Sequence, residues 1–194
     1  MAKHTVVETS RLASTHWGAH IYSLIHDADL DNGAVGYVGD LSEDVDGRET
    51  YEFGVFDANT INKKRAVLVA HPEWSYDEST RANQALSAYY NKADIPFRAF
   101  DLTAGDDFAI SAEGFDATGV DEIAVGQYVI LDANKTTFKL TEDVDDTTAM
   151  GFVGKITKTL IKSVGYEKVD GEMYGATKTL YVVHVERNDV SFGE

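Results

Sequence analysis

Short runs in which apolar and polar residues alternate fill the stretch from Pro96 to Leu140. Each run places two large apolar side chains two positions apart, and residues that favour turns separate the runs. The paired positions are Phe100 and Leu102, Phe108 and Ile110, Tyr128 and Ile130, and Phe138 and Leu140. A period of two is typical of β-strands, because successive side chains of a strand point to opposite faces of the sheet. The pattern therefore predicts a compact antiparallel β unit.

Further strands are predicted on both sides of this unit. They cover residues 35–39, 51–55, 64–71, 151–161 and 178–186. The pairs Asn32-Gly33 and Asp170-Gly171 predict turns before the first of these strands and between the last two. The strand that begins after residue 151 is expected to present one apolar face, made of Phe152, Ile156 and Leu160.

One helix is predicted, over residues 77–91. Asp77 or Ser79 can cap its first turn, and apolar residues then recur at helical spacing. Those residues are Ala82, Ala85, Leu86 and Tyr89. Short strands with turns between them dominate the rest of the chain. We therefore expect a mainly β fold, an antiparallel β-barrel or sandwich with one short helix.

The first part of the chain, residues 1–24, keeps neither a helical nor a strand period. It predicts an extended N-terminal arm, followed by a single β-rich domain over residues 25–188 and a short tail at 189–194. The apolar side chains of the arm need a surface that covers them, either on their own domain or on a neighbouring subunit. These side chains are Val6, Val7, Leu12, Trp17 and Ile21.

Composition argues against several functions. The chain has 33 acidic and 17 basic residues and a formal net charge of -16, which disfavours binding to nucleic acid phosphates or anionic lipids. It has no cysteine, and therefore no disulfide, thiolate metal site or cysteine nucleophile. No apolar run approaches the roughly 18 residues of a membrane span, and no signal-peptide core is found. We expect a cytosol-like compartment, unless the protein leaves as part of a larger particle.

Asp27, Asp29 and Asp31 are weak candidates for metal binding, because they alternate ahead of a glycine like the first oxygen ligands of a calcium loop. The rest of the calcium pattern fails. Asn32 stands where the sharp turn needs glycine, and Val38 stands where the closing glutamate belongs. A turn rich in Asp and Asn explains the spacing better, so we predict no metal and no other cofactor.

Two further groups of polar residues were candidates for chemistry. His16 and His20 would share a face if their segment were helical, which suits metal binding, but Gly18 disfavours that helix. Asp106 and Asp107 are adjacent, and adjacent strand residues point to opposite faces, so their carboxylates are not expected to converge for acid and base catalysis. We therefore predict that the protein is not an enzyme.

Four segments of the chain follow one another in a distinctive order. They are LDNGAVGYVGDL (30–41), RAVLVAHPEWSYDES (65–79), PFRAFDLTAGDDFAIS (96–111) and VGQYVILD (125–132). Together they resemble the small structural proteins of tailed-bacteriophage heads that act as capsid cement or decoration proteins. The resemblance covers residues 25–140. It implies a β-rich fold without an active site, which assembles in the bacterial cytoplasm, often as trimers, and bridges capsomers on the outside of the capsid.

On this resemblance we predict a virion structural protein, a capsid cement or decoration protein that stabilises contacts between capsomers. Its predicted partners are the major capsid protein and sister copies of the chain, with no direct contact to nucleic acid or membrane. The predicted capsid or inter-subunit contacts are apolar and aromatic side chains of the arm and of the segment before the predicted helix. They are Val6, Val7, Leu12, Trp17, Tyr22, Trp74 and Tyr76.

Two alternatives remain open at this point. A head fibre or tail component would form an elongated oligomer. A carbohydrate-binding or calcium-dependent adhesion module would use aromatic platforms together with the turn from Asp27 to Asp31. A large rise in melting temperature with calcium, abolished by Asp29→Ala, would favour the adhesion module.

Overall fold

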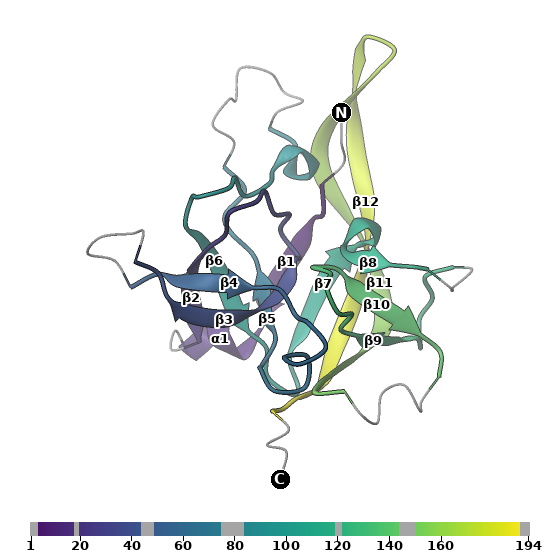
Figure 1. Cartoon of the computed structure of the whole chain (residues 1–194). Coiled ribbons are helices and arrows are strands. Elements are labelled where there is room, and N and C mark those ends of the chain that lie inside the picture. The colour runs from purple at the N-terminus through teal and green to yellow at the C-terminus, as the bar shows by residue number, and fades with distance from the viewer. Residues whose placement is uncertain are drawn as a thin grey trace.

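The computed structural model describes residues 4–17, 20–43, 49–74, 84–118, 122–143 and 150–190 (Figure 1). The fold is mainly β, as the alternating pattern predicts, and consists of a small closed barrel beside a larger sheet. The barrel lies on the left of Figure 1 and the sheet on the right. The helical elements within the described ranges are α1 (Ala13–Trp17) and two 3-10 turns, η1 (Leu86–Ala88) and η2 (Ala112–Gly114).

The barrel is closed by five strands in the order β2-β4-β3-β5-β6. Their bounds are β2 (Ile21–Ile25), β3 (Val35–Leu41), β4 (Tyr51–Gly54), β5 (Val67–Val69) and β6 (Phe97–Asp101). All pairs are antiparallel except β2 with β4. Large apolar side chains such as Leu24, Phe53 and Phe97 form a buried cluster of the barrel. Alternation along each strand explains this, because every second side chain points inward.

The larger sheet has seven strands in the order β1-β7-β12-β11-β9-β10-β8. Their bounds are β1 (Val7–Arg11), β7 (Asp107–Ser111), β8 (Phe115–Asp116), β9 (Tyr128–Ile130), β10 (Phe138–Thr141), β11 (Phe152–Val169) and β12 (Glu172–Asn188). Strands β11 and β12 form one long hairpin, which reaches well above the rest of the sheet in Figure 1.

The barrel and the sheet share one hydrophobic core. Val35 and Leu68 of the barrel and Phe108, Phe138 and Val183 of the sheet belong to the same buried cluster. The rings of Phe108 and Phe138 lie 5.5 Å apart, close enough to add aromatic contact to simple burial. The face of the sheet that is turned away from this core is called the outer face below.

The N-terminal segment is covered by its own chain, which is the first of the two alternatives left open by the sequence. Strand β1 pairs with β7, and Val6, Val7 and Leu12 are all buried. The backbone N–H of Ala13 donates to Asp106 Oδ1 at 2.7 Å, which satisfies a free donor at the start of α1. These residues therefore form part of the fold of their own chain.

Two details of the predicted secondary structure differ in the structure. Residues 84–91 contain only the 3-10 turn η1, whereas a helix was expected over 77–91; residues 77–83 lie outside the described ranges. The α-helix found within the described residues is α1, near the N-terminus. The stretch 96–140 does form strands, but β6 belongs to the barrel and β7 to the sheet, so it is not one compact unit.

The predicted apolar face of β11 is interrupted by a β-bulge. Ile156 is opposite Val183 and Lys158 is opposite Val182, so Thr157 is an extra residue on β11. One extra residue exchanges the two faces of a strand. For this reason Ile156 is buried in the shared core, whereas Leu160 faces the outer side and is partly exposed.

Candidate functional site

The end of the β11–β12 hairpin is a two-stranded ribbon, here called the projecting ribbon and defined as residues 161–179. Strand β9 pairs with β11 only from Val153 to Lys155, and β7 pairs with β12 only from Leu180 to His184. Beyond these points the two strands pair with each other alone within the described chain. Such a ribbon is at best marginally stable by itself in water, so its contacts with the body of the protein matter.

Several large apolar side chains of the projecting ribbon are exposed. Ile161 is 81% exposed, Tyr174 53% and Tyr166 45%. Met173 is also exposed, and the four residues lie on both strands of the ribbon. Cross-strand pairing places Ile161, Tyr166 and Met173 on one face of the ribbon and Tyr174 on the other. Apolar side chains exposed on a protruding element are typical of a surface that contacts another macromolecule.

The base of the ribbon is held against the body of the protein. Val164 is buried with Leu180, and Leu86 of η1 packs against them. Gly165 has φ +106°, and a Cβ at this position would lie 3.1 Å from the Cα of Ala85. Glycine is therefore required both by the backbone conformation and by the close approach of the η1 segment.

Two lysines tie the ribbon to the N-terminal segment. Lys178 Nζ donates to the backbone oxygen of His4 and to Glu113 Oε1, both at 2.8 Å, and its side chain is only 12% exposed. Lys162 Nζ forms an ion pair with Glu8 Oε2 at 3.0 Å. Hydrogen bonds from a charged donor are stronger than neutral ones, so these contacts fix the direction in which the ribbon leaves the sheet.

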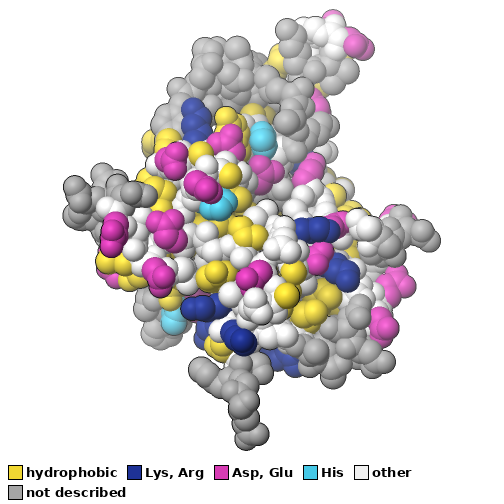
Figure 2. All heavy atoms as spheres, viewed as in Figure 1, with side chains coloured by type: hydrophobic (Ala, Val, Ile, Leu, Met, Phe, Trp, Pro, Cys, Tyr) yellow, Lys and Arg dark blue, Asp and Glu magenta, His cyan; other side chains and the backbone are white. Residues whose placement is uncertain are grey.

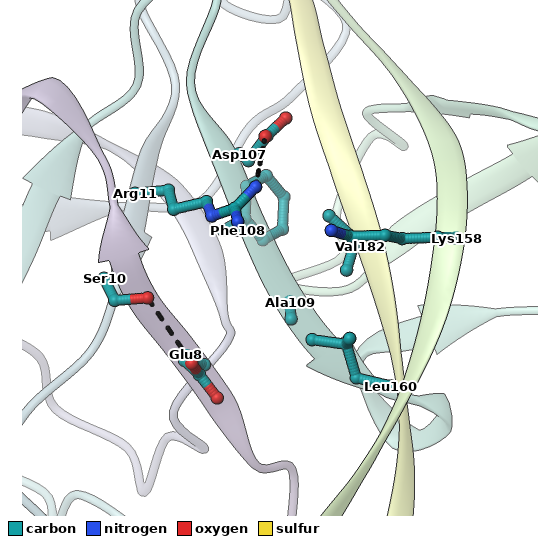
Figure 3. A pocket seen from close by; sticks show the side chains of 9 residues that line it. All are labelled: Glu8, Ser10, Arg11, Asp107, Phe108, Ala109, Lys158, Leu160 and Val182. Carbon is teal, nitrogen blue, oxygen red and sulfur yellow. Dashed lines mark hydrogen bonds and ion pairs between the residues drawn. The ribbon is translucent and has the colours of Figure 1, made fainter.

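A groove of about 230 Å³ runs along the outer face next to the base of the ribbon (Figure 3). Its floor includes Ala109 of β7 and Val182 of β12. In Figure 3, Lys158 and Leu160 extend from β11 across β12 toward β1, which carries Glu8, Ser10 and Arg11. The groove exists because a small alanine on β7 lies between longer side chains of β1 and β11.

The polar groups of the groove hold one another in place. His184 Nδ1 donates to Asp107 Oδ1 at 2.8 Å, and Arg11 Nη1 lies 3.6 Å from Asp107 Oδ2. Ser10 Oγ donates to Glu8 Oε1 at 3.4 Å. Ser10 lies on β1 and His184 on β12, with β7 between them, so they do not form a nucleophile and base pair. This network therefore joins β1, β7 and β12.

A second cavity, of about 320 Å³, opens at one end of the barrel and is here called the barrel mouth. It is lined by Tyr22, Tyr37, Val38, Lys63, Lys64, Arg65, Val67, Asp101 and Val190. Acidic side chains are spread over much of the face in Figure 2, whereas several Lys and Arg side chains gather low in that view. The barrel mouth brings three consecutive basic residues together in a strongly acidic protein.

Asp101 lies at the edge of the barrel mouth and is almost completely buried. Its Oδ2 contacts Arg65 Nη2 at 3.2 Å and His20 Nδ1 at 3.4 Å, while the buried Oδ1 has no hydrogen-bond partner among the described residues. Burial raises the pKa of Asp101 above its usual value, and the charges of Arg65 and His20 oppose that rise. The carboxylate therefore anchors Arg65 at the mouth.

The predicted contact residues are distributed over the molecule rather than gathered on one surface. Val6, Val7 and Leu12 are buried in their own chain and offer no free surface to a partner. Tyr22 lies half-buried at the barrel mouth, and Trp74 is 80% exposed. Trp17 ends α1, but its side chain is outside the described part, as is the whole of Tyr76.

The weak metal candidates do not converge on one point. Asp29 Oδ1 accepts from the N–H of Ala93, and Asp31 Oδ1 contacts His4 Nδ1 at 2.7 Å. Asp27 lies beside His26, with Oδ1 and Nδ1 3.4 Å apart. The part of the chain that the structure describes contains no group of three or more His, Asp or Glu residues placed to hold a metal ion.

The other two polar pairs are also separated. Helix α1 ends at Trp17, so His16 and His20 do not share a helical face, and His20 instead contacts Asp101. Asp106 is buried and accepts hydrogen bonds from the N–H groups of Ala13 and Thr103, whereas the neighbouring carboxylate faces the groove. Their side chains thus point to different sides, as the strand geometry predicts.

Comparisons with known proteins give no assignment for this fold. No protein-family model matches the chain, and neither curated proteins nor solved structures gave a significant match. In the described residues, no helix is both long enough and apolar enough to cross a membrane.

Proposed function

We propose that this protein is a structural component of a tailed-bacteriophage head, a cement or decoration protein that binds the outside of the capsid and stabilises contacts between capsomers. The proposal starts from the resemblance of residues 25–140 to that family. The structural observation that supports it is the projecting ribbon, which carries Ile161, Tyr166 and Tyr174 in exposed positions on an element that extends beyond the sheet. An extended ribbon can reach across a seam between two capsomers.

The contact surface in this proposal differs from the one expected from the sequence. The arm residues Val6, Val7 and Leu12 are buried in their own domain, so this proposal assigns the main capsid contact to the exposed apolar side chains of the ribbon. Trp74 and Tyr22 remain predicted contacts. The partners proposed are the major capsid protein and sister copies.

The energy available from such a contact fits a cementing role. Apolar surface gains roughly 25 cal/mol per Å² when it is removed from water, so a fully buried large side chain contributes about 1.5–3 kcal/mol. Because a capsid offers many equivalent seams, a modest gain per copy is repeated many times. The net charge of -16 suits a position outside the shell, away from packaged DNA, because polyanions repel an acidic surface.

A co-sedimentation assay tests the proposal. Capsids that lack their accessory protein are mixed with the wild-type chain or with the variant Ile161→Ser/Tyr174→Ser. If the ribbon is the contact, the variant should bind at least about tenfold more weakly, because two apolar anchors are lost and 1.4 kcal/mol corresponds to a factor of ten. Circular dichroism melting should be nearly unchanged, because both side chains are exposed.

Val125→Ser is the matched control. Val125 is also an exposed apolar residue, at 56%, but it lies in the connection before β9 and not in the ribbon. It should bind like the wild type. Wild-type protein that fails to bind any such capsid would refute the capsid assignment. Equal binding by the ribbon variant and the control would keep the assignment but reject the ribbon as its contact surface.

A further inference from the structure

The barrel mouth has basic groups whose charges are not paired within the described chain. Lys63 and Lys64 stand on its rim and have no ion pair there, although Lys64 Nζ lies 5.9 Å from the ring centre of Tyr37. Lys135, Lys162 and Lys178, by contrast, form ion pairs with acidic side chains. In a chain with 33 acidic and 17 basic residues, two adjacent unpaired lysines mark a local surface that attracts carboxylates.

The cavity beside these lysines is lined by apolar and aromatic side chains. Val38, Val67 and Val190 contribute apolar surface, and Tyr22 and Tyr37 contribute ring faces and hydroxyl groups. A volume of about 320 Å³ can receive a large apolar side chain. The mouths of β-barrels are common binding places for this reason. The barrel mouth therefore suits an apolar side chain accompanied by negative charge.

The end of the hairpin formed by β3 and β4 offers that combination. Leu41, at the last position of β3, is 58% exposed. Asp40 precedes it and Glu43 follows shortly after; both are exposed, and neither has an ion pair or a hydrogen-bonded partner within the described ranges. We call Asp40, Leu41 and Glu43 the acidic tip.

The backbone around the acidic tip is also open to a partner. Strand β5 pairs with β3 only at Val35 and Gly36, so the following residues of β3 have no ladder partner on that side. The register between β3 and β4 shifts between Val38 and Leu41, which is a β-bulge. A bulge bends a strand, and an unpaired strand edge offers N–H and C=O groups to another chain.

We propose that a second copy of this chain binds here, so that the acidic tip of each copy enters the barrel mouth of the other. Leu41 fills the apolar cavity, and Asp40 and Glu43 face Lys63 and Lys64 of the partner copy. Both surfaces belong to the same stretch of β3: Val38 lines the mouth and Leu41 is the tip, roughly 10 Å away at about 3.3 Å per residue. A twofold axis near Gly39 therefore brings both contacts together, as an isologous interface requires.

This interface concerns the barrel, whereas the proposed capsid contact concerns the ribbon. It stands on the charges and the cavity of the chain itself and does not depend on the capsid assignment. An acidic segment of a different protein would meet the same chemistry in the barrel mouth, and that case is an outcome of the experiment below.

Charge reversal with mixing tests the dimer. One variant is Lys63→Glu/Lys64→Glu and the other is Asp40→Lys/Glu43→Lys. Each is studied alone, and then as an equimolar mixture, by sedimentation velocity at physiological ionic strength, where long-range repulsion is largely screened. We expect the wild type to dimerise and each variant alone to dimerise at least about tenfold more weakly, because like charges then face each other. The mixture should restore dimers, because opposite charges again meet at both contacts.

Lys139→Glu/Lys158→Glu is the matched control for Lys63→Glu/Lys64→Glu. It changes the net charge of the protein by the same amount, but at two sites in the large sheet. It should dimerise like the wild type. Leu41→Ser, which keeps all charges, should also weaken the dimer by about tenfold, because it removes the apolar anchor. Melting curves identify any variant that does not fold.

Three results would overturn the proposal. The first is a wild-type protein that stays monomeric at every concentration tested. If an acidic peptide from another protein then binds the barrel mouth, the partner is not a second copy. The second is a dimer that persists in both charge-reversed variants. The third is a mixture of folded variants that stays monomeric although the wild type dimerises. Capsid binding measured in parallel remains an independent readout of the ribbon.

Discussion

The two ends of the β11–β12 hairpin belong to the same two strands but have different surroundings. At one end β9 and β7 flank the hairpin, and Ile156 and Val183 are buried in the core shared with the barrel. At the other end Ile161 and Tyr174 are exposed on a ribbon without a third strand in the described chain. An apolar side chain in a strand therefore does not by itself indicate a core position, because burial depends on neighbours supplied by distant parts of the chain.

The largest difference between the two ends should appear when each loses one isoleucine. Ile156→Ala removes a buried side chain from the core and should lower the free energy of unfolding by about 2–5 kcal/mol. Ile161→Ala changes an exposed side chain and should stay within about 0.5 kcal/mol of the wild type. Urea denaturation of both variants gives the comparison. Similar losses would mean that the ribbon is covered in solution.

A smaller effect is expected where the ribbon meets the body. Lys178→Ala removes the hydrogen bonds to His4 and Glu113 and should cost about 1.5–3 kcal/mol, the range for bonds that involve a charged group. Hydrogen exchange should quicken first in the ribbon, because this contact anchors its base.

Lys158→Ala serves as the control for this anchor, because Lys158 is an exposed lysine on the same strand pair, without an ion pair among the described residues. It should leave stability and exchange unchanged. If the two alanine variants behave alike, the hydrogen bonds of Lys178 do not hold the ribbon.

The smallest effect should arise at the turn of the ribbon. Gly171 has φ +92°, which an L-residue adopts with strain, so Gly171→Ala should raise the free energy of forming the turn by about 1 kcal/mol. Amides next to the turn should exchange faster, while the global unfolding midpoint stays nearly constant because the strain is confined to the ribbon. Gly175→Ala, at a glycine with open space and without positive φ, should leave this exchange unchanged.

Local signals in the sequence predicted local structure well. Asn32-Gly33 and Asp170-Gly171 both form turns, and Gly33, Asp170 and Gly171 have positive φ. Period-two alternation found the strands around Phe108 and Phe138 and the mainly β class. These features depend on only a few neighbouring residues, so a single sequence contains the information needed.

Nonlocal features were harder to predict. The bulge at Thr157 moves Leu160 to the outer face, and no turn residue marks it in the sequence. Likewise Phe100 and Phe108 lie close in the chain but in different sheets, because pairing with β2 and with β12 decides where each strand belongs. Such pairings arise from contacts that alternation along one strand does not encode.

The candidate site was located only in part from the sequence. The sequence predicts contacts for Tyr22 of the arm and for the aromatic Trp74, and both are accessible, but it does not predict the ribbon residues Ile161 and Tyr174. The sequence around these residues favours a strand, and it does not distinguish an exposed strand from a buried one. The sequence predicts strands only over 151–161 and 178–186, whereas β11 and β12 continue to Val169 and from Glu172, well beyond the short strands beside them.

The order of strands in the sheet also constrains when the protein can fold during its synthesis. Strand β7 lies between β1, which is made first, and β12, which is made last among the strands. Until β12 has left the ribosome, one edge of β7 and the apolar side chains of β1 have no complete sheet to join. The sheet can therefore be completed only after synthesis of β12, and we expect folding to be slow and largely post-translational, because the pairing of β1, β7 and β12 joins distant parts of the chain.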